Sequence, residues 1–280
     1  MQGATAANGT AGFQRPSLAL AAGNVHLAFH HGYDGYRYVA GKATDNPSNW
    51  KSTLIPTLPG YDYTAQRASL ALDSKGNPAV AFILNGDNGS AEAFWRPGGN
   101  SVLVADNGGY GTDDPDVRLV FFGTQPRVVY AGAMDDNYFA DYDHALWLIA
   151  SPDDGTTWGR RVNVPSDGNR DLTPPVDIAV GSKGQVAIVT EDNGGNPGGV
   201  ACGDPKLPIS ADLLNWKTCS PSTLRSPEIF AYSPSVEFSG NDRLYVAFLE
   251  ATTAENALTN GVTVWRQPRD WNFPPPPPQE

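Results

Sequence analysis

The chain has 280 residues and carries 30 aspartates and glutamates against 19 lysines and arginines, which gives a formal net charge of −11. This acidic balance argues against a general basic surface for nucleic acid and against docking on anionic lipid. No run of 18 apolar residues occurs, so we expect no insertion into a membrane.

One pattern recurs five times along the chain: proline or alanine, a small or polar residue, an alternating apolar strand, a turn and a second apolar strand. Its equivalent positions are Ser17, Ser69, Asp116, Pro175 and Ser235, at intervals of 52, 47, 59 and 60 residues. The 30 glycines and 24 prolines gather in turn-like clusters, which favours short strands. We therefore expect an all-β chain of four-stranded antiparallel units at residues 16–56, 68–106, 115–165, 174–220 and 234–271.

The third unit contains the turn motif S-x-D-x-G-x-T-W, in which the defining residues are Ser151, Asp153, Gly155 and Trp158. The Asp153 carboxylate can accept hydrogen bonds from backbone N–H groups of a tight turn, and Gly155 permits the positive φ that such a turn needs. Trp158 is expected to begin the next strand and to bury a large apolar ring between sheets. We interpret Asp153 as structural, because the chemistry of the turn accounts for it.

The motif and the repeat resemble the Asp-box β-propellers of the sialidase-like superfamily. The resemblance implies that the motif lies between the third and fourth strands of a blade, on the face opposite the usual binding site. With five repeats, it predicts one five-bladed propeller over residues 1–273. Closure of the ring by residues 4–9 or by residues 271–273 is left open. Sialidases have six blades and hold a carboxylate with three arginines, and this chain offers only Arg15 and Arg67 at matching positions.

In the geometry of this family, the loops between second and third strands share a face with the loops that lead into each inner strand. In this chain those loops are rich in tyrosines and carboxylates, which suit sugars because rings stack on C–H faces and carboxylates accept from hydroxyls. The alternative is a set of solvated loop tips. The candidate ligand-binding residues are Arg15, Tyr33, Asp34, Tyr61, Asp62, Tyr63, Arg67, Asp114, Tyr138, Tyr142 and Glu191.

Oxygen ligands for a hard cation are concentrated in one loop, where the candidates are Asp135, Asp136, Asp141 and Asp143. Calcium is the cofactor that such a set would bind. The spacing is not that of an EF-hand, and a solvated acidic loop is the favoured alternative. His30 and His31 do not form a metal pair in this interpretation, because adjacent strand residues point to opposite faces.

The two cysteines, Cys202 and Cys219, bracket a predicted strand and turn. We expect them to form a disulfide between neighbouring strands, with two buried thiols as the alternative. The low lysine content fits a secreted or cell-surface protein, although residues 1–4 lack the charged start and apolar core of a signal peptide.

These observations favour an extracellular binding module for a glycan or a protein, which uses the loop-rich face. The first alternative is a glycoside hydrolase or lyase with carboxylates in the central funnel. The second is a structural or assembly subunit. Residues 274–280 begin with five prolines, which predict either an exposed tail or a semi-rigid polyproline spacer to a further domain or surface.

Overall fold

The structure is a computed structural model that describes residues 13–31, 34–86, 89–106, 116–133, 144–163, 172–182, 186–192, 197–203, 217–218, 230–251 and 262–266. Within these ranges the regular structure is β-sheet, apart from the short 3-10 helix η2 at Pro47–Asn49 and 3-10 structure at Asp34. The expected all-β class is confirmed. No helix in the described ranges has the length and apolarity needed to cross a membrane.

Contacts divide the chain into two compact units. Unit 1 consists of Met1–Gly111, Val117–Val128 and Ser151–Trp158, and unit 2 consists of Thr112–Asp116, Val129–Ala150 and Gly159–Glu280. The prediction of a single domain over residues 1–273 is not tested by this division and stays a prediction.

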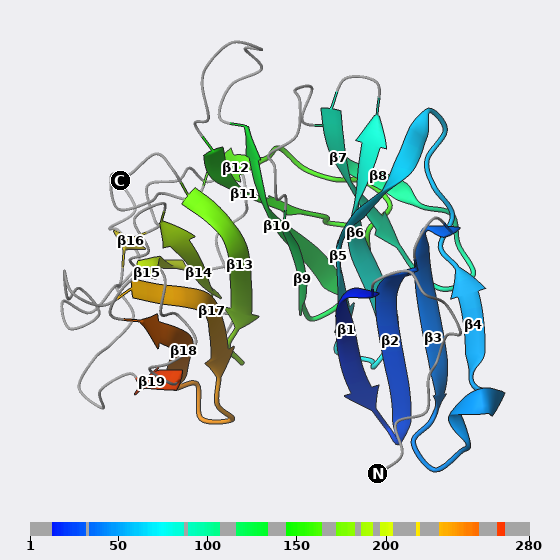
Figure 1. The fold of residues 1–280 in the computed structure, drawn as a ribbon, viewed down its shortest axis with the longest axis horizontal. Helices are drawn as coiled ribbons and strands as arrows, with labels where there is room; N and C mark the ends of the chain where they lie inside the picture. The colour runs from blue at the N-terminus through cyan, green and yellow to red at the C-terminus, as the bar shows by residue number, and fades with distance from the viewer. Residues whose placement is uncertain are drawn as a thin grey trace. The chain divides into compact units, whose positions relative to one another are not determined.

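Unit 1 contains two four-stranded sheets whose strands lie side by side in chain order, β1-β2-β3-β4 and β5-β6-β7-β8 (Figure 1). Every pair of neighbouring strands in them is antiparallel. The strands of the first sheet are β1 Phe13–Ala21, β2 Asn24–His31, β3 Tyr36–Lys42 and β4 Lys51–Leu54. Those of the second are β5 Tyr61–Leu72, β6 Pro78–Gly86, β7 Gly89–Trp95 and β8 Val102–Asp106.

A third sheet has the order β12-β11-β10-β9, and its strands are β9 Val117–Phe122, β10 Gln125–Ala133, β11 His144–Ala150 and β12 Val162–Asn163. Unit 2 adds a four-stranded sheet of β13 Leu172–Val180, β14 Val186–Asp192, β15 Pro197–Gly203 and β16 Lys217–Thr218. Its other sheet has three described strands, β17 Phe230–Phe238, β18 Leu244–Ala251 and β19 Val262–Arg266. The sheets follow the predicted repeats in chain order, and a closed ring of five blades stays a prediction.

The first strands of four sheets begin before the predicted starts at residues 16, 68, 174 and 234, because each contains a β-bulge that the sequence pattern did not reveal. The pairing register shifts between Gln14 and Ser17 in β1, and at the corresponding places in β5, β13 and β17. Prolines occupy three of these shifts, at residues 16, 174–175 and 234. Proline has no N–H to give to a ladder, so it is tolerated at a bulge. In these three repeats, the proline that appeared to mark the start of the strand lies at an interruption within it.

A polar side chain on one first strand accepts a hydrogen bond from the backbone of the next first strand. In unit 1, the Ser17 hydroxyl accepts from the Leu70 N–H at 2.9 Å, and the Ser69 hydroxyl accepts from the Leu119 N–H at 2.9 Å. Ser17 and Ser69, which the sequence pattern aligned with each other, therefore make the same kind of hydrogen bond.

In unit 2, carboxylates make the corresponding bonds. Asp116 Oδ2 accepts from the Val176 N–H at 3.0 Å, and Asp177 Oδ2 accepts from the Val236 N–H at 3.0 Å. Asp177, rather than the predicted Pro175, is thus the equivalent residue in the fourth repeat. Proline offers no side-chain acceptor, and Asp177 lies two residues further on the same face of the strand.

The core of unit 1 is formed by apolar side chains of its two sheets, with Tyr36, Phe82 and Trp95 among those fully buried. His26 and Tyr38 form a buried polar pair in it, with 2.6 Å between His26 Nδ1 and the Tyr38 hydroxyl. Burial raises the pKa of Tyr38 to about 12 and lowers the pKa of His26. Both groups therefore stay neutral near pH 7, so the pair adds no buried charge.

The S-x-D-x-G-x-T-W turn connects β11 and β12, the third and fourth strands of their sheet. Asp153 Oδ1 accepts from the Thr157 N–H at 2.8 Å, the Ser151 hydroxyl accepts from the Gly155 N–H at 2.8 Å, and Gly155 has a φ of 94°. These bonds make the turn as expected. Trp158 precedes β12 by several residues and does not begin it, and its half-buried ring meets Phe94 edge-on.

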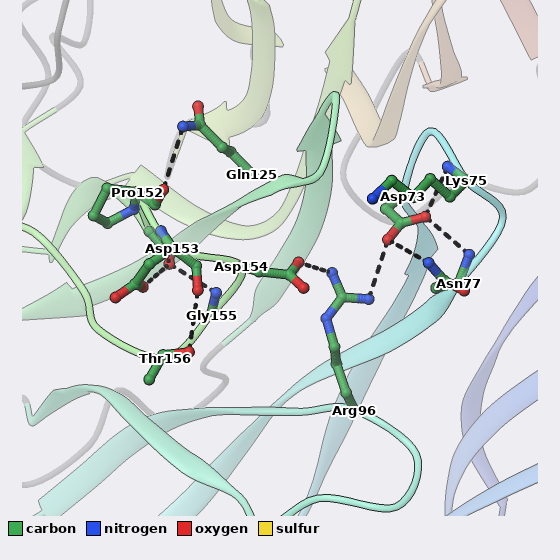
Figure 2. A network of polar contacts seen from close by, with 11 residues as sticks. Asp73, Lys75, Asn77, Arg96, Gln125, Pro152, Asp153, Asp154, Gly155 and Thr156 are labelled. Atoms are coloured by element: carbon green, nitrogen blue, oxygen red, sulfur yellow. Dashed lines mark hydrogen bonds and ion pairs between the residues drawn. The ribbon is translucent and has the colours of Figure 1, made fainter.

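Arg96 joins this turn to the β5–β6 turn, and Figure 2 shows its guanidinium between Asp154 and Asp73. Its Nη2 pairs with Asp154, and its Nη1 lies 3.5 Å from Asp73 Oδ2. The Asp73 side chain is only 2% exposed and accepts from the N–H groups of Lys75 and Asn77, each at 2.9 Å. Arg96 therefore neutralises a buried carboxylate, which would be left uncompensated if the guanidinium were removed.

Acid should destabilise unit 1 through Asp73. Burial tends to raise the pKa of this carboxyl, but hydrogen bonds from Asn77 and Lys75, together with the charge of Arg96, outweigh burial and lower it. A lowered folded-state pKa gives stability that is complete above the ordinary carboxyl value of about 3.9 and is lost as pH falls through the folded value. Denaturant unfolding between about pH 5 and pH 2 should show a shallower loss in Asp73→Asn than in wild type or in Asp45→Asn, which changes an exposed carboxylate. Equal slopes in all three proteins would exclude this role.

Candidate functional site

The candidate site lies at one end of the two sheets of unit 1, which we call the loop-rich end and define by Asp34, Tyr61, Asp62 and Asp106. The start of each first strand pairs with the end of the second strand, as in Phe13 with His31 and Tyr61 with Gly86. The third strands start at the same end, since His30 pairs with Tyr36 and Gly86 pairs with Gly89. The turns at Asp73–Asn77 and Ser151–Trp158 lie at the other end.

Tyr61 and Asp106 form a polar pair across the whole width of the second sheet. The Tyr61 hydroxyl donates to Asp106 Oδ2 at 3.0 Å, although β5 and β8 are separated by β6 and β7. Three strand spacings amount to about 14 Å, so the Tyr61 side chain must extend over the ends of the two middle strands. Burial, and then the hydrogen bond and charge of Asp106, raise the pKa of Tyr61. The phenol therefore stays protonated, as a donor fixed beside an exposed carboxylate.

Asp34 is the carboxylate that the first sheet places at the loop-rich end. Its side chain is 57% exposed, and its Oδ2 lies 3.1 Å from His31 Nδ1 and 3.6 Å from an Arg37 nitrogen. The His31 N–H donates to the Gly35 carbonyl at 2.8 Å, which holds the end of β2 to the residue just before β3. A carboxylate held by two nitrogen groups keeps one oxygen available for a ligand hydroxyl.

A cluster of aromatic rings underlies this end. The Tyr36 ring is fully buried and meets His30, Tyr63 and Phe82, with ring centroids 5.3, 6.1 and 5.0 Å away. The Tyr36 hydroxyl donates to the Ile83 carbonyl at 3.0 Å. Burial, and then the neighbouring charge of His31, lower the pKa of His30. The base of the site is therefore rigid and uncharged.

Tyr61, Asp62 and Tyr63 were expected in a loop, and the structure places them in β5. The prediction was wrong because the bulge between Tyr63 and Ala68 breaks the alternating pattern and hides the first part of the strand. Asp62 is exposed, and Tyr61 and Tyr63 are both half-buried and packed against the core of unit 1.

The other candidates are described only in part. The backbones of Arg15, Arg67 and Glu191 lie in β1, β5 and β14, and their side chains are outside the described set. Outside the described residues lie Tyr33, Asp114, Asp135, Asp136, Tyr138, Asp141, Tyr142, Asp143 and Cys219, so the calcium site and the disulfide with Cys202 stay predictions. The described ranges contain no group of three His, Cys, Asp or Glu side chains placed to hold a metal ion.

Sequence reasoning missed Asp106, and it gave His31 and Arg37 no part in the site. Asp106 ends an outer strand, 45 residues after its partner Tyr61, and no local pattern links them. Arg37 falls within the alternating pattern of β3 and carries no motif. The H-x-x-D spacing of His31 and Asp34 was the one local signal available, because these two side chains, three residues apart, meet in the structure.

The sequence matches no protein-family model and no curated protein. Several solved structures are similar to it in fold. An α-L-arabinanase from Penicillium chrysogenum superimposes with a TM-score of 0.54 at 14% identity, covering 86% of this chain and 78% of its own. An ulvan lyase gives 0.59 at 11% identity, with coverages of 92% and 69%. A sialidase described as Hadza microbial gives 0.56 at 16% identity, with coverages of 86% and 54%, so this chain spans about half of that sialidase.

At these identities the likeness concerns the fold alone. The arabinanase, the lyase and the sialidase have β-propeller-like folds. Their similarity covers most of this chain and agrees with its succession of antiparallel sheets. The chain thus has an all-β, propeller-like fold.

Proposed function

We propose that this chain is a secreted or cell-surface carbohydrate-binding module, built as a five-bladed β-propeller of the sialidase-like Asp-box type, that binds a glycan at its loop-rich end. The observation that carries the proposal is the Tyr61–Asp106 pair. An aromatic ring with a fixed hydroxyl and an adjacent carboxylate offers a stacking surface and acceptors for sugar hydroxyls.

Two further observations support a carbohydrate ligand. The structural neighbours are described as an arabinanase, an ulvan lyase and a sialidase, all of which act on carbohydrates. Among the described residues of the loop-rich end, Asp34 is held by His31 and Arg37, while exposed Asp62 and Asp106 keep this end acidic. Neutral, hydroxyl-rich ligands suit such an end better than a polyanion does.

Changes at the loop-rich end should weaken binding without unfolding the protein. In Tyr61→Ala and Asp62→Ala we expect about tenfold or greater loss of affinity for a glycan selected on an array, since stacking and charge-assisted hydrogen bonds each contribute about 1–3 kcal/mol. Tyr61→Phe keeps the ring and loses only the bond to Asp106, so its loss should be smaller. Isothermal titration measures affinity, and thermal melting measures stability.

Lys75→Ala is the matched control, because Lys75 is exposed in a turn at the other end of the same sheet. It should bind as wild type does. If Tyr61→Ala and Asp62→Ala also bind as wild type does, the loop-rich end is not the binding site. Running the array with and without a chelator tests whether calcium takes part.

The alternative is a glycoside hydrolase or lyase. It is favoured by the three carboxylates of the loop-rich end, which are Asp34, Asp62 and Asp106. Hydrolysis of a glycosidic bond uses a pair of carboxyl groups. Incubation of the array-selected glycan with the protein separates the two functions. New reducing or unsaturated ends would indicate an enzyme, and an unchanged ligand would indicate a binding module.

A further inference from the structure

The connection between β2 and β3 depends on Gly35. This glycine has a φ of 96°, a left-handed conformation that other residues rarely adopt, and its carbonyl accepts from the His31 N–H at 2.8 Å. Asp34 precedes it directly, so the conformation of Gly35 decides where the Asp34 carboxylate lies. Gly35 has no side chain to cover its own Cα, so the support for this residue comes from a side chain of another strand.

That support comes from Tyr63 of β5, in the neighbouring sheet of unit 1. A Cβ atom added to Gly35 would lie 2.5 Å from Cδ2 and Cζ of the Tyr63 ring, so the ring lies directly on the bare Cα. Real Cβ atoms do not approach ring carbons this closely, which means that the contact requires glycine.

The Tyr63 ring is itself fixed by two further contacts. Its hydroxyl donates to the Ile55 carbonyl at 2.6 Å, and its edge meets the buried Tyr36 ring. The Ile55 N–H in turn donates to the Tyr36 carbonyl at 2.9 Å, which ties the chain after β4 to the start of β3. Burial raises the pKa of Tyr63, although a backbone hydrogen bond from Thr57 opposes the shift. The hydroxyl is therefore a stable donor at neutral pH.

We propose that Tyr63 is a positioning residue, which packs on Gly35, keeps the Gly35 carbonyl on the His31 N–H and so fixes Asp34 for ligand binding. This inference rests on the proposed function for its last step. It assigns Tyr63 a role different from that of a sugar platform, because both its ring and its hydroxyl are already engaged within the protein. Tyr61 and Tyr63 lie on the same face of β5. In this proposal Tyr61 contacts the ligand, and Tyr63 supports Gly35.

Amide hydrogen exchange tests the contact without a ligand, because the His31 N–H donates to the Gly35 carbonyl. In Tyr63→Ala we expect the His31 amide to exchange at least about tenfold faster relative to the amides of β6. Tyr63→Phe keeps the ring on Gly35 and loses only the bond to Ile55, so it should retain wild-type protection of His31. If the His31 amide accelerates no more than the β6 amides in Tyr63→Ala, Tyr63 does not hold this hydrogen bond and the proposal is overturned.

Glycine substitutions test the same contact from the other side. Gly35→Ala adds a Cβ at a φ of 96° against the Tyr63 ring, and Gly98→Ala adds one at a φ of 88° with no atom within 4 Å. Both variants carry the backbone strain, and only the first meets a ring. We expect the unfolding equilibrium constant to rise about tenfold more for Gly35→Ala than for Gly98→Ala, and the difference to disappear when both are made in Tyr63→Ala. An equal effect of the two alanines in the wild-type background would overturn the proposal.

Binding of wild type, Tyr63→Phe and Tyr63→Ala to a glycan array tests whether the contact between Tyr63 and Gly35 is needed for ligand binding. Loss of signal in Tyr63→Ala with retention in Tyr63→Phe supports positioning. Full signal in Tyr63→Ala overturns it. Absence of signal from all three proteins contradicts the proposed function, and the hydrogen-exchange result still decides whether Tyr63 holds the bond between His31 and Gly35.

Discussion

Replacing Trp95 with alanine is expected to lower the free energy of unfolding by about 3–5 kcal/mol, the range for removing a large aromatic side chain from a core. Trp95 is 1% exposed and meets Tyr38 edge-on, and its indole N–H donates to the Gly99 carbonyl at 3.0 Å. Alanine would leave a cavity in the core of unit 1 and an unpaired carbonyl. Denaturant unfolding followed by intrinsic fluorescence and circular dichroism measures the loss.

Trp158→Ala is the matched comparison, because Trp158 is half-buried and meets the Phe94 ring edge-on. Trp158→Ala should lower the free energy of unfolding clearly less than Trp95→Ala does. A larger loss in Trp158→Ala would mean that the turn motif, and not the core between the first two sheets, dominates the stability of unit 1.

Replacing Arg96 with methionine is expected to cost about 2–4 kcal/mol, because it leaves the buried Asp73 carboxylate without its cation. Methionine keeps most of the unbranched stem, so the change removes the charge and the stacking of the guanidinium on Phe121, whose centroid lies 5.0 Å away. Equilibrium unfolding in urea measures the effect. Lys51→Met, at an exposed position of β4, is the control and should change stability by less than about 0.5 kcal/mol.

A double-mutant cycle separates the two acidic partners of Arg96. Asp73→Asn and Arg96→Met should be strongly coupled, and Asp154→Asn and Arg96→Met weakly coupled, because Asp154 is exposed and screened by solvent. Strong coupling to Asp154 alone would show that the ion pair at the turn, and not the neutralised buried carboxylate, carries the energy.

The turn at residues 151–158 could be predicted from the sequence because the side-chain bonds of Ser151 and Asp153 that shape it join residues at most four positions apart. Ser151, Asp153 and Gly155 have the chemistry that the turn requires, and the structure shows each in that role. The repeat was also visible, since Ser17 and Ser69 make the same bond to the next first strand.

Contacts between distant residues could not be predicted in this way. Arg96 meets Asp73 and Asp154, which are 23 residues before it and 58 after it, and Tyr61 meets Asp106 across a sheet. Such pairs depend on the packing of whole sheets, and no local pattern encodes them. Trp95 and Trp158 illustrate the same limit, because the motif drew attention to the half-buried ring and not to the fully buried one.

The loop-rich end could be predicted from the sequence only in part. Its composition was recognised, but the bulge in β5 concealed that Tyr61 and Tyr63 belong to a strand, and the sequence did not separate their roles. Only the structure shows that one tyrosine extends to Asp106 while the other packs on Gly35.

A crystal structure of the protein with an oligosaccharide selected on a glycan array tests the central claim most directly. We expect a sugar ring against Tyr61, with its hydroxyls within hydrogen-bond distance of Asp62 or Asp106, and Tyr63 still packed on Gly35. A sugar bound at the opposite end, near the turns joined by Arg96, would contradict the account.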